Sequence, residues 1–464
     1  MVSKFTILRY LVRLKNTYVI RKIKPFLKRN LARWNETNSK ISEQLFQSIP
    51  FWIASALTGL LAYLYYLVFR YTEALSFDLV EKYRWSIFIL TPVSFFISWW
   101  LVRRFAPFAK GSGIPQVMAA IEISKPTTRP LVDQLLSLRI ILVKVFSSAF
   151  KVLGGGVVGR EGPTIQIASS VFQVVYKYLP FWWKPISQKN ILVAGAASGL
   201  AAAFNTPLGG IIFAIEELSK FHIKSYKSSL FVAVVIAGLV AQSLGGSYLY
   251  LGYPKLEASG WMVYLGVLIV SILSGFFGAK VGAVLWKVVR YIKSKKKNSQ
   301  QITVVILASI LVSTSIYFLG MDAMGSGKEI MERTLFTSDK SVEWYIPFVR
   351  MGGLISSFGM GGAGGIFAPS LSIGASIGAV VSGMMELTGH NTNLLIVVGM
   401  TAFLTGITRS PFTSAIVVIE MTDRHSAIFF LMFAAVIASA IAYIVERKSL
   451  YDFLKEAYID EVKK

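Results

Sequence analysis

Long uncharged stretches recur along the whole chain. Six of them are residues 51–69, 86–102, 191–215, 261–279, 302–320 and 426–445. Each approaches or exceeds the roughly 18 apolar residues that mark a membrane-crossing helix. Hydrophobic and polar residues do not alternate with the period of a strand, which argues against an outer-membrane barrel. The pattern therefore predicts an all-α integral membrane protein that crosses the bilayer several times.

The charge balance supports this class and indicates an orientation. Hydrophobic residues make up 54% of the chain and charged residues 16%, too few charges to cover a soluble protein. The net charge of +24 invites a nucleic-acid interpretation, but Lys and Arg crowd residues 1–48 and 293–297, which flank apolar segments. The positive-inside rule then places both regions in the cytoplasm, beneath a cell inner membrane, and nucleic-acid binding is the weaker interpretation.

The sequence gives no support for metal or enzyme chemistry or for ATP-driven transport. The chain has no cysteine, and therefore no disulfide framework, thiolate metal site or cysteine nucleophile. A Gly-Lys-Ser/Thr phosphate-binding motif is also absent, so nothing suggests ATP-driven transport. His222, His390 and His425 do not have metal-ligand spacing. We therefore expect no metal, no cofactor and no enzyme chemistry.

The chain contains an internal duplication. Three segments recur in the same order: 111–113 as 325–327, 154–170 as 361–376, and 195–217 as 399–421, with Glu216 matching Glu420. The expected organisation is a basic cytoplasmic arm (1–48), a first membrane repeat (49–250), an inter-repeat helix with a basic cytoplasmic loop (251–300), a second repeat (301–450) and a cytoplasmic end (451–464). Duplicated halves with Gly- and Pro-interrupted helices are typical of transporters whose substrate site lies where the halves meet.

Two glycine-rich motifs in the first half each place a polar side chain at the start of a helix. Ser112 and Gly113 precede a helix that opens with proline, so the hydroxyl and nearby amides can donate to an anion; plain N-capping by Ser112 is the alternative. Glu161 follows Arg160 and precedes Gly162, and a carboxylate there occupies the position of a bound anion. Glu161 is thus predicted to compete with the anion, while a structural pair with Arg160 is the alternative.

Two further segments could take part in binding or transport. One is the uncharged counterpart of the Glu161 motif in the second half, and the other is a pair of carboxylates near the end of the first half. In the segment 365–369, backbone amides at Ile366 and Phe367 can hold an anion, unless the segment is merely a turn. Glu216 and Glu217 follow an apolar run and point to different faces of a helix. Burial favours the neutral form of a carboxyl group, which suits proton transfer near neutral pH; surface acids at a helix end are the alternative.

The motifs 111–115, 159–163 and 365–369, followed by a late tyrosine, resemble the CLC family of chloride channels and chloride/proton antiporters. The resemblance covers about 51–451 and implies the CLC fold of two inverted-topology repeats of tilted and broken helices, in a homodimer with one pore per subunit. It implies that Ser112 and Tyr451 contact the central anion and that Ile366 and Phe367 supply amides. Glu161 resembles the external gating glutamate.

Further features of the resemblance bear on the type of transporter. Glu217 matches the internal proton-transfer glutamate of the antiporters, where channels usually carry a non-acidic residue. Ser112 favours chloride over nitrate and argues against the fluoride-exporting branch. Gln116 and Met118 are neutral where bacterial antiporters carry acids, a departure that bears on coupling. Because the sequence ends at Lys464, we do not expect the regulatory CBS domains of eukaryotic members.

The interpretation that best fits these residues is a secondary active chloride/proton antiporter. The predicted anion-binding residues are Ser112, Gly113, Arg160, Gly162, Ile366, Phe367 and Tyr451. Protons are expected to pass between Glu217 and Glu161. A passive CLC channel gated by Glu161 is the first alternative, and a cation or amino-acid transporter is a more distant one. The expected partners are chloride, protons, the lipid bilayer and a second copy of the chain.

Overall fold

The computed structural model describes residues 18–180, 182–183, 185–218, 227–246, 250–295 and 297–463, with the backbone alone at 18–44, 126 and 227. The chain forms two compact units, Met1–Pro50 and Phe51–Lys464. In the first unit the described residues are helical throughout. His222, Lys296 and the first 17 residues of the basic arm lie outside the described ranges.

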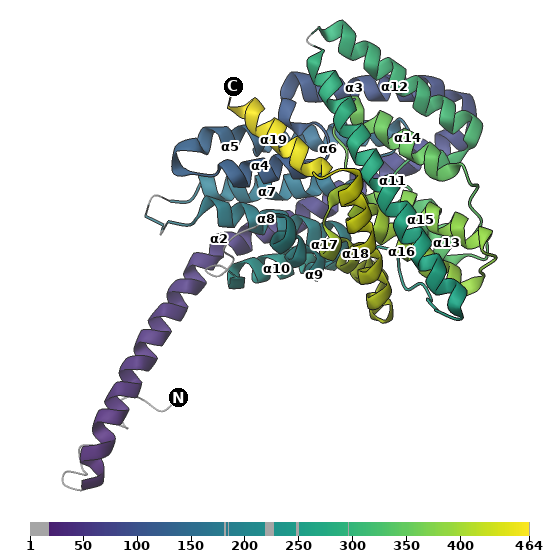
Figure 1. Ribbon diagram of the computed structural model, residues 1–464. Coiled ribbons are helices and arrows are strands. Elements are labelled where there is room, and N and C mark those ends of the chain that lie inside the picture. The colour runs from purple at the N-terminus through teal and green to yellow at the C-terminus, as the bar shows by residue number, and fades with distance from the viewer. Residues whose placement is uncertain are drawn as a thin grey trace. The chain divides into compact units, whose positions relative to one another are not determined.

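The described residues form helices and no strand, which confirms the predicted all-α class. The helices of the first half are α2 (Tyr18–Lys82), α3 (Ile87–Phe105), α4 (Ile114–Ile123), α5 (Arg129–Leu135), α6 (Leu138–Leu153), α7 (Glu161–Lys177), α8 (Gln188–Phe204), α9 (Pro207–Phe213) and α10 (Lys227–Gly245). Those of the second half are α11 (Trp261–Ser294), α12 (Asn298–Leu319), α13 (Lys328–Phe336), α14 (Ile346–Gly359), α15 (Phe367–Met384), α16 (Gly389–Thr408), α17 (Pro411–Thr422) and α18 (Ile428–Val445). A final helix, α19 (Leu450–Val462), follows them (Figure 1).

Within the described ranges, eight helices are long and apolar enough to cross a membrane. Five of the six stretches expected from the sequence lie in such helices. The sixth, 191–215, was wrongly predicted as one span. Asn205 adopts a left-handed conformation (φ 56°), which ends α8, and Pro207 starts α9. Asparagine tolerates this conformation and proline favours the first helical turn, so the two residues together break the helix.

The structure repeats the duplication seen in the sequence. Arg409 ends α16 in the same left-handed conformation that Asn205 gives to the end of α8, and Pro411 opens α17 as Pro207 opens α9. The helices α7 to α10 thus have counterparts in α15 to α18. Both halves break their helices at matching positions.

The glycine-rich loops of the two halves pair with each other in the interior. The backbone N–H of Gly159 donates to the Gly365 carbonyl at 2.9 Å, and that of Gly365 donates back at 2.7 Å. A second pairing joins Gly111 to the loop at Gly362–Gly364, with N–O distances of 2.9 and 3.1 Å. Two non-helical segments at membrane depth thereby satisfy each other's polar groups. The pairing also brings the first residues of α4, α7 and α15 to one place.

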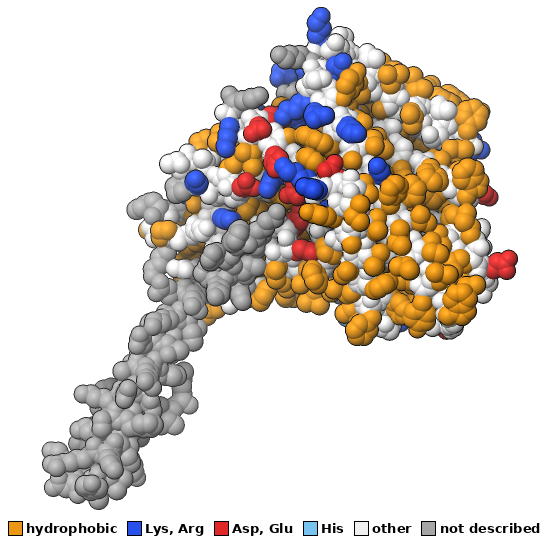
Figure 2. Space-filling view, viewed as in Figure 1, with side chains coloured by type: hydrophobic (Ala, Val, Ile, Leu, Met, Phe, Trp, Pro, Cys, Tyr) orange, Lys and Arg blue, Asp and Glu red, His pale blue; other side chains and the backbone are white. Residues whose placement is uncertain are grey.

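The surface of the second unit is divided between apolar and charged regions. Hydrophobic side chains cover the face that α11 and α18 present in Figure 2. The exposed apolar side chains of these two helices include Ile272, Phe433 and Val436. Lys and Arg side chains gather near α19 in the same view. An exposed apolar face of this kind is what a lipid-facing surface requires.

Candidate functional site

Two buried hydroxyl groups approach each other in the interior of the protein. Ser112 lies just before α4, and Tyr451 is the second residue of α19; each is 1% exposed. Their hydroxyls lie close together, yet neither has a hydrogen-bond partner of normal geometry in the described part of the chain. Ser112 does not cap α4, so plain N-capping does not account for it. A pair of unused buried donors is costly unless a ligand accepts from them.

Close approach of α7 to Ser112 depends on glycine. A Cβ atom on Gly162, in the first turn of α7, would lie 2.2 Å from the Ser112 Oγ atom. A Cβ atom on Gly113 would lie 2.7 Å from the Gln166 Cβ atom, and Gly113 has a φ of 102° that favours glycine. Because both positions lack a side chain, the starts of α4 and α7 meet at the two hydroxyls. Their partial positive charges therefore add at one point.

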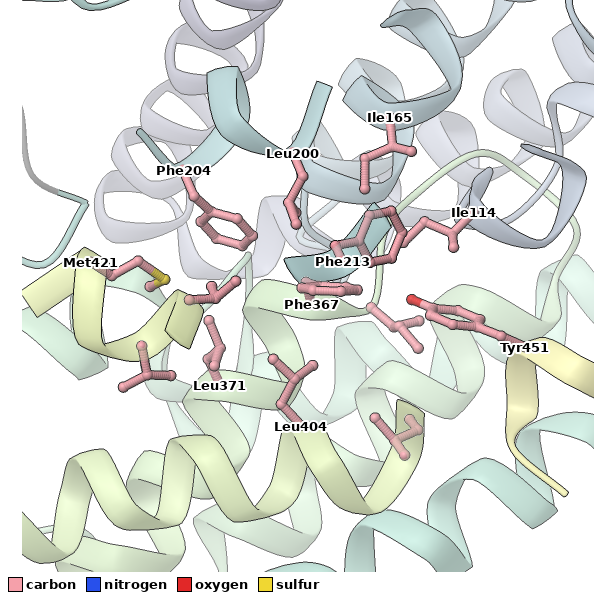
Figure 3. Close-up of a cluster of buried hydrophobic side chains, with 14 of the residues drawn as sticks. Ile114, Ile165, Leu200, Phe204, Phe213, Phe367, Leu371, Leu404, Met421 and Tyr451 are labelled. Atoms are coloured by element: carbon pink, nitrogen blue, oxygen red, sulfur yellow. The ribbon is translucent and has the colours of Figure 1, made fainter. Parts of the chain in front are cut away.

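The start of α15 lies beside the same point. Ile366 and Phe367 are buried, and they open an 18-residue helix, so the segment is not merely a turn. Figure 3 shows the Phe367 ring between Phe204 and Tyr451, with the Tyr451 hydroxyl directed toward it. The Phe204 and Phe367 ring centres are 6.0 Å apart. Free amides at the start of α15 can thus face an anion without placing a second charge there.

Glu161, the first residue of α7, has a carboxylate that is 1% exposed. The Tyr250 hydroxyl donates to its Oε1 atom at 3.3 Å. Its Oε2 atom lies against the backbone, since a Cβ atom on Gly159 would be 2.3 Å away; within the described residues Oε2 has no hydrogen-bond partner of normal geometry. The same Cβ atom would lie 3.1 Å from the Ala368 Cβ atom, so the carboxylate lies close to the start of α15.

Arg160 has contacts other than its neighbouring carboxylate. Its guanidinium donates to the Ala203 carbonyl at 3.1 Å and lies over the Tyr66 ring, 4.4 Å from the ring centre. These contacts fix the guanidinium near α2 and the end of α8. Its predicted role as an anion-binding residue remains a prediction.

Glu216 and Glu217 lie on a π-helical turn at Ala214–Leu218, and their carboxylates accept from different donors at the start of α17. Such turns are frequent at functional sites. The Glu217 Oε2 atom accepts from the Ser410 hydroxyl at 2.5 Å. The Glu216 carboxylate instead accepts from the backbone N–H groups of Phe412 and Thr413, at 3.1 and 2.7 Å. Glu216 is therefore not an ordinary surface acid, because it caps α17.

The two halves exchange these caps. While Glu216 of the first half caps α17, Glu420 of the second half accepts from Leu208 and Gly209 at the start of α9, at 3.0 and 2.6 Å. Each carboxylate satisfies donors that the other half leaves unpaired. The exchange locks α9 to α17 and holds the turn that carries Glu217.

Two buried lysines lie behind the Ser112 motif, and sequence reasoning missed them. Lys144 and Lys151 on α6 are fully buried. The Lys144 ammonium donates to the carbonyls of Ala109 and Gly111, at 2.8 and 2.9 Å. An ionisable residue inside an apolar helix by itself indicates a functional role, so the sequence could have indicated both lysines. The sequence could not have indicated Tyr250 and Ser410, because their importance depends on partners far away in the chain.

Metal binding has no support in the described residues. No group of three or more His, Asp or Glu side chains among them is arranged to hold a metal ion. His390 lies at the start of α16, and the exposed His425 lies 3.6 Å from Asp423. The neutral Gln116 donates to the carbonyls of Phe108 and Lys110.

Comparison with known proteins places the chain in a family. The family model described as voltage gated chloride channel matches residues 94–443, and the chain belongs to this family. It is 29% identical over 377 residues to the H(+)/Cl(-) exchange transporter ClcA of Klebsiella pneumoniae subsp. pneumoniae, covering 78% of this chain and 77% of the relative. It is 27% identical over 370 residues to ClcA of Vibrio parahaemolyticus, covering 77% of each.

Solved structures show the same fold. A slow cyanobacterial Cl⁻/H⁺ antiporter matches with a TM-score of 0.77 and 22% identity, over 90% of this chain and 99% of that one. A CLC-type fluoride/proton antiporter matches with a TM-score of 0.73 and 17% identity, over 88% and 97%. The predicted family and the CLC fold are thus confirmed, and the protein is a multi-pass membrane protein. The roles of individual site residues remain predictions.

Proposed function

We propose that the protein is a secondary active transporter that exchanges chloride for protons. The observation that carries the proposal is the meeting of the Ser112 and Tyr451 hydroxyls at the starts of α4, α7 and α15, with the Glu161 carboxylate beside them. The relatives named H(+)/Cl(-) exchange transporter support the choice of ions. This role is transport and requires no enzyme chemistry.

Chloride is held by uncharged donors in this proposal. The Ser112 and Tyr451 hydroxyls donate to the ion, together with amides at Gly113, Gly162, Ile366 and Phe367. Arg160 contributes positive charge on the side of Glu161. Helix starts and hydroxyls attract an anion without the tight binding that a direct ion pair would impose.

The Glu161 carboxylate joins the two transported ions. When it is ionised, it occupies the entrance that chloride must pass; when it is protonated, it loses its attraction for the helix starts and moves aside. Protons reach it from the cytoplasmic side through Glu217, which the Ser410 hydroxyl holds in place. Because both ions need the same carboxylate, the movement of one drives the movement of the other.

Reversal potentials under combined chloride and pH gradients test this exchange. Purified protein is reconstituted in a planar bilayer or in liposomes, and the voltage of zero current is measured as each gradient changes. A coupled exchanger gives a reversal potential that shifts with the pH gradient at fixed chloride. A passive channel gives one set by chloride alone, and this result would refute the proposal.

The proposed assembly is a homodimer in a cell inner membrane, with both termini in the cytoplasm. Leu208 and Phe412 are each 54% exposed, at the starts of α9 and α17, and suit an apolar subunit contact. Mass measurement by light scattering in detergent distinguishes a dimer from a monomer. Because the chain has no cysteine, single introduced cysteines and a membrane-impermeant thiol reagent report the side of each terminus.

A further inference from the structure

A cavity of about 420 Å³ lies next to Glu161, and neither Ser112 nor Tyr451 lines it. Its walls come from α2 and α13, and Glu161 and Arg160 border it. The basic loop 293–297 joins α11 to α12 on the proposed cytoplasmic side. The far end of α12, and α13 after it, therefore lie on the external side. The cavity is the external approach to Glu161.

The first carboxylate in the cavity belongs to Glu73 on α2 and reaches the backbone just before the start of α13. Its Oε1 atom accepts from the Ser326 backbone N–H at 2.7 Å. Ser326 lies in the second copy of the Gly-Ser-Gly motif, the counterpart of Ser112. A protein carboxylate thus meets the backbone of this copy, whereas Ser112 in the first copy faces the proposed anion site. Glu73 and Glu161 are close enough for their charges to repel each other.

The second carboxylate, Glu329, lies in the first turn of α13 at the cavity rim, outside the membrane-spanning helices. Partial burial, together with the charges of Glu73 and Glu332, raises its pKa to about 7. No ion pair or hydrogen bond engages its carboxylate within the described ranges, whereas Glu332 pairs with Lys328 at 3.2 Å. Charged and titratable groups surround it on several elements: Tyr66, Arg70, Glu73 and Glu81 on α2, Arg160 and Glu161 at α7, Tyr250, Asp322, and Lys328 and Glu332 on α13.

We propose that Glu329 and Glu73 form an external proton relay that loads and unloads Glu161. Glu329 takes a proton from external water and passes it through the cavity to the Glu73 carboxylate, which passes it to the ionised Glu161. Each carboxylate accepts one proton and releases one, so the relay ends unchanged. The inference rests on the proposed exchange and adds the outer half of its proton path.

The relay is tested by the dependence of coupled flux on external pH. In Glu329→Gln and Glu73→Gln, we expect chloride-driven proton flux to fall at least about threefold at an external pH of about 8, where water supplies few protons. At an external pH of about 5 the flux should match wild type, because Glu161 is then protonated directly. The exchange ratio should stay unchanged. Glu329→Asp should restore the wild-type profile. Glu343→Gln is the matched control, because Glu343 is an exposed carboxylate between α13 and α14 that does not line the cavity.

An impermeant thiol reagent tests whether residue 329 faces the external side of the membrane. Because the chain has no cysteine, Glu329→Cys can be labelled from outside with an impermeant reagent that carries either a carboxylate or a neutral group. Only the carboxylate reagent should restore flux at high external pH. An unchanged pH profile in both Gln variants and their double variant would overturn the relay, as would an equal loss at every pH. Wild-type protein that moves chloride without protons would instead defeat the proposed exchange itself.

Discussion

Replacing Ser112 by alanine should separate stability from anion binding. In most proteins, deleting a buried hydroxyl removes a hydrogen bond within the fold and destabilises it. Here the Ser112 hydroxyl has no such bond of normal geometry in the described part of the protein. Ser112→Ala therefore removes a donor that serves only the bound ion. The same reasoning applies to Tyr451→Phe, which deletes the facing hydroxyl and keeps the ring.

The size of both effects follows from hydrogen-bond energies. A hydrogen bond to a charged partner contributes about 1.5–3 kcal/mol, so losing one should weaken chloride binding roughly 10- to 150-fold. An unsatisfied buried hydroxyl costs about 1–3 kcal/mol, so its removal should offset the small loss of packing. In chloride-free buffer the thermal midpoint of Ser112→Ala should thus equal or exceed that of wild type.

Isothermal titration with chloride and thermal unfolding in detergent measure the two quantities on one sample. Ser170→Ala is a matched control, because the Ser170 hydroxyl is equally buried in α7 and donates to the Gln166 carbonyl at 2.8 Å. It should leave chloride affinity unchanged. If Ser112→Ala keeps wild-type affinity, or if it loses stability without chloride, then the hydroxyl serves the fold and the anion site is misplaced.

Four further outcomes test the rest of the site. Glu217→Ala should abolish proton movement while chloride still moves in the liposome assay, and continued proton pumping would refute its role. Glu161→Ala should remove both the pH dependence and the proton coupling of chloride flux. Glu216→Ala should lower the free energy of unfolding by about 1–2 kcal/mol, because the start of α17 loses its cap; a thermal midpoint like that of wild type would contradict the exchanged caps. Burial opposes ionisation of Glu461, but Lys110 and Lys293 outweigh this effect and hold the pKa of Glu461 below the usual 4.5. The ionised Glu461 should therefore stabilise the fold above about pH 4.5, and this stabilisation should be lost as the pH falls further. The thermal midpoint of Glu461→Gln should not show this loss.

The sequence predicted the parts of the site that depend on local pattern. Glycine next to Ser112 and Glu161 marked two helix starts, and the structure has a helix start at each. The stretch 191–215 was misjudged because hydropathy does not register the left-handed Asn205, which breaks the helix. Tyr250 and Ser410 could not be predicted, since their partners Glu161 and Glu217 lie far away in the chain. Contacts of this kind are set by the packing of segments that are distant in the sequence.

The exchanged caps explain why two similar halves can carry different chemistry. Glu216 and Glu420 occupy matching positions and make the same kind of contact, so they serve the fold in both halves. Once that contact is secured, the neighbouring positions are free to differ. Glu217, next to the first cap, reaches Ser410, whereas the matching residue of the second half is the buried Met421. In the same way, α7 opens with Glu161 and α15 with Phe367. The duplication supplies a symmetric frame. The titratable groups Glu161 and Glu217, however, belong to the first half alone. A proton path can therefore differ from the anion path, which both halves build.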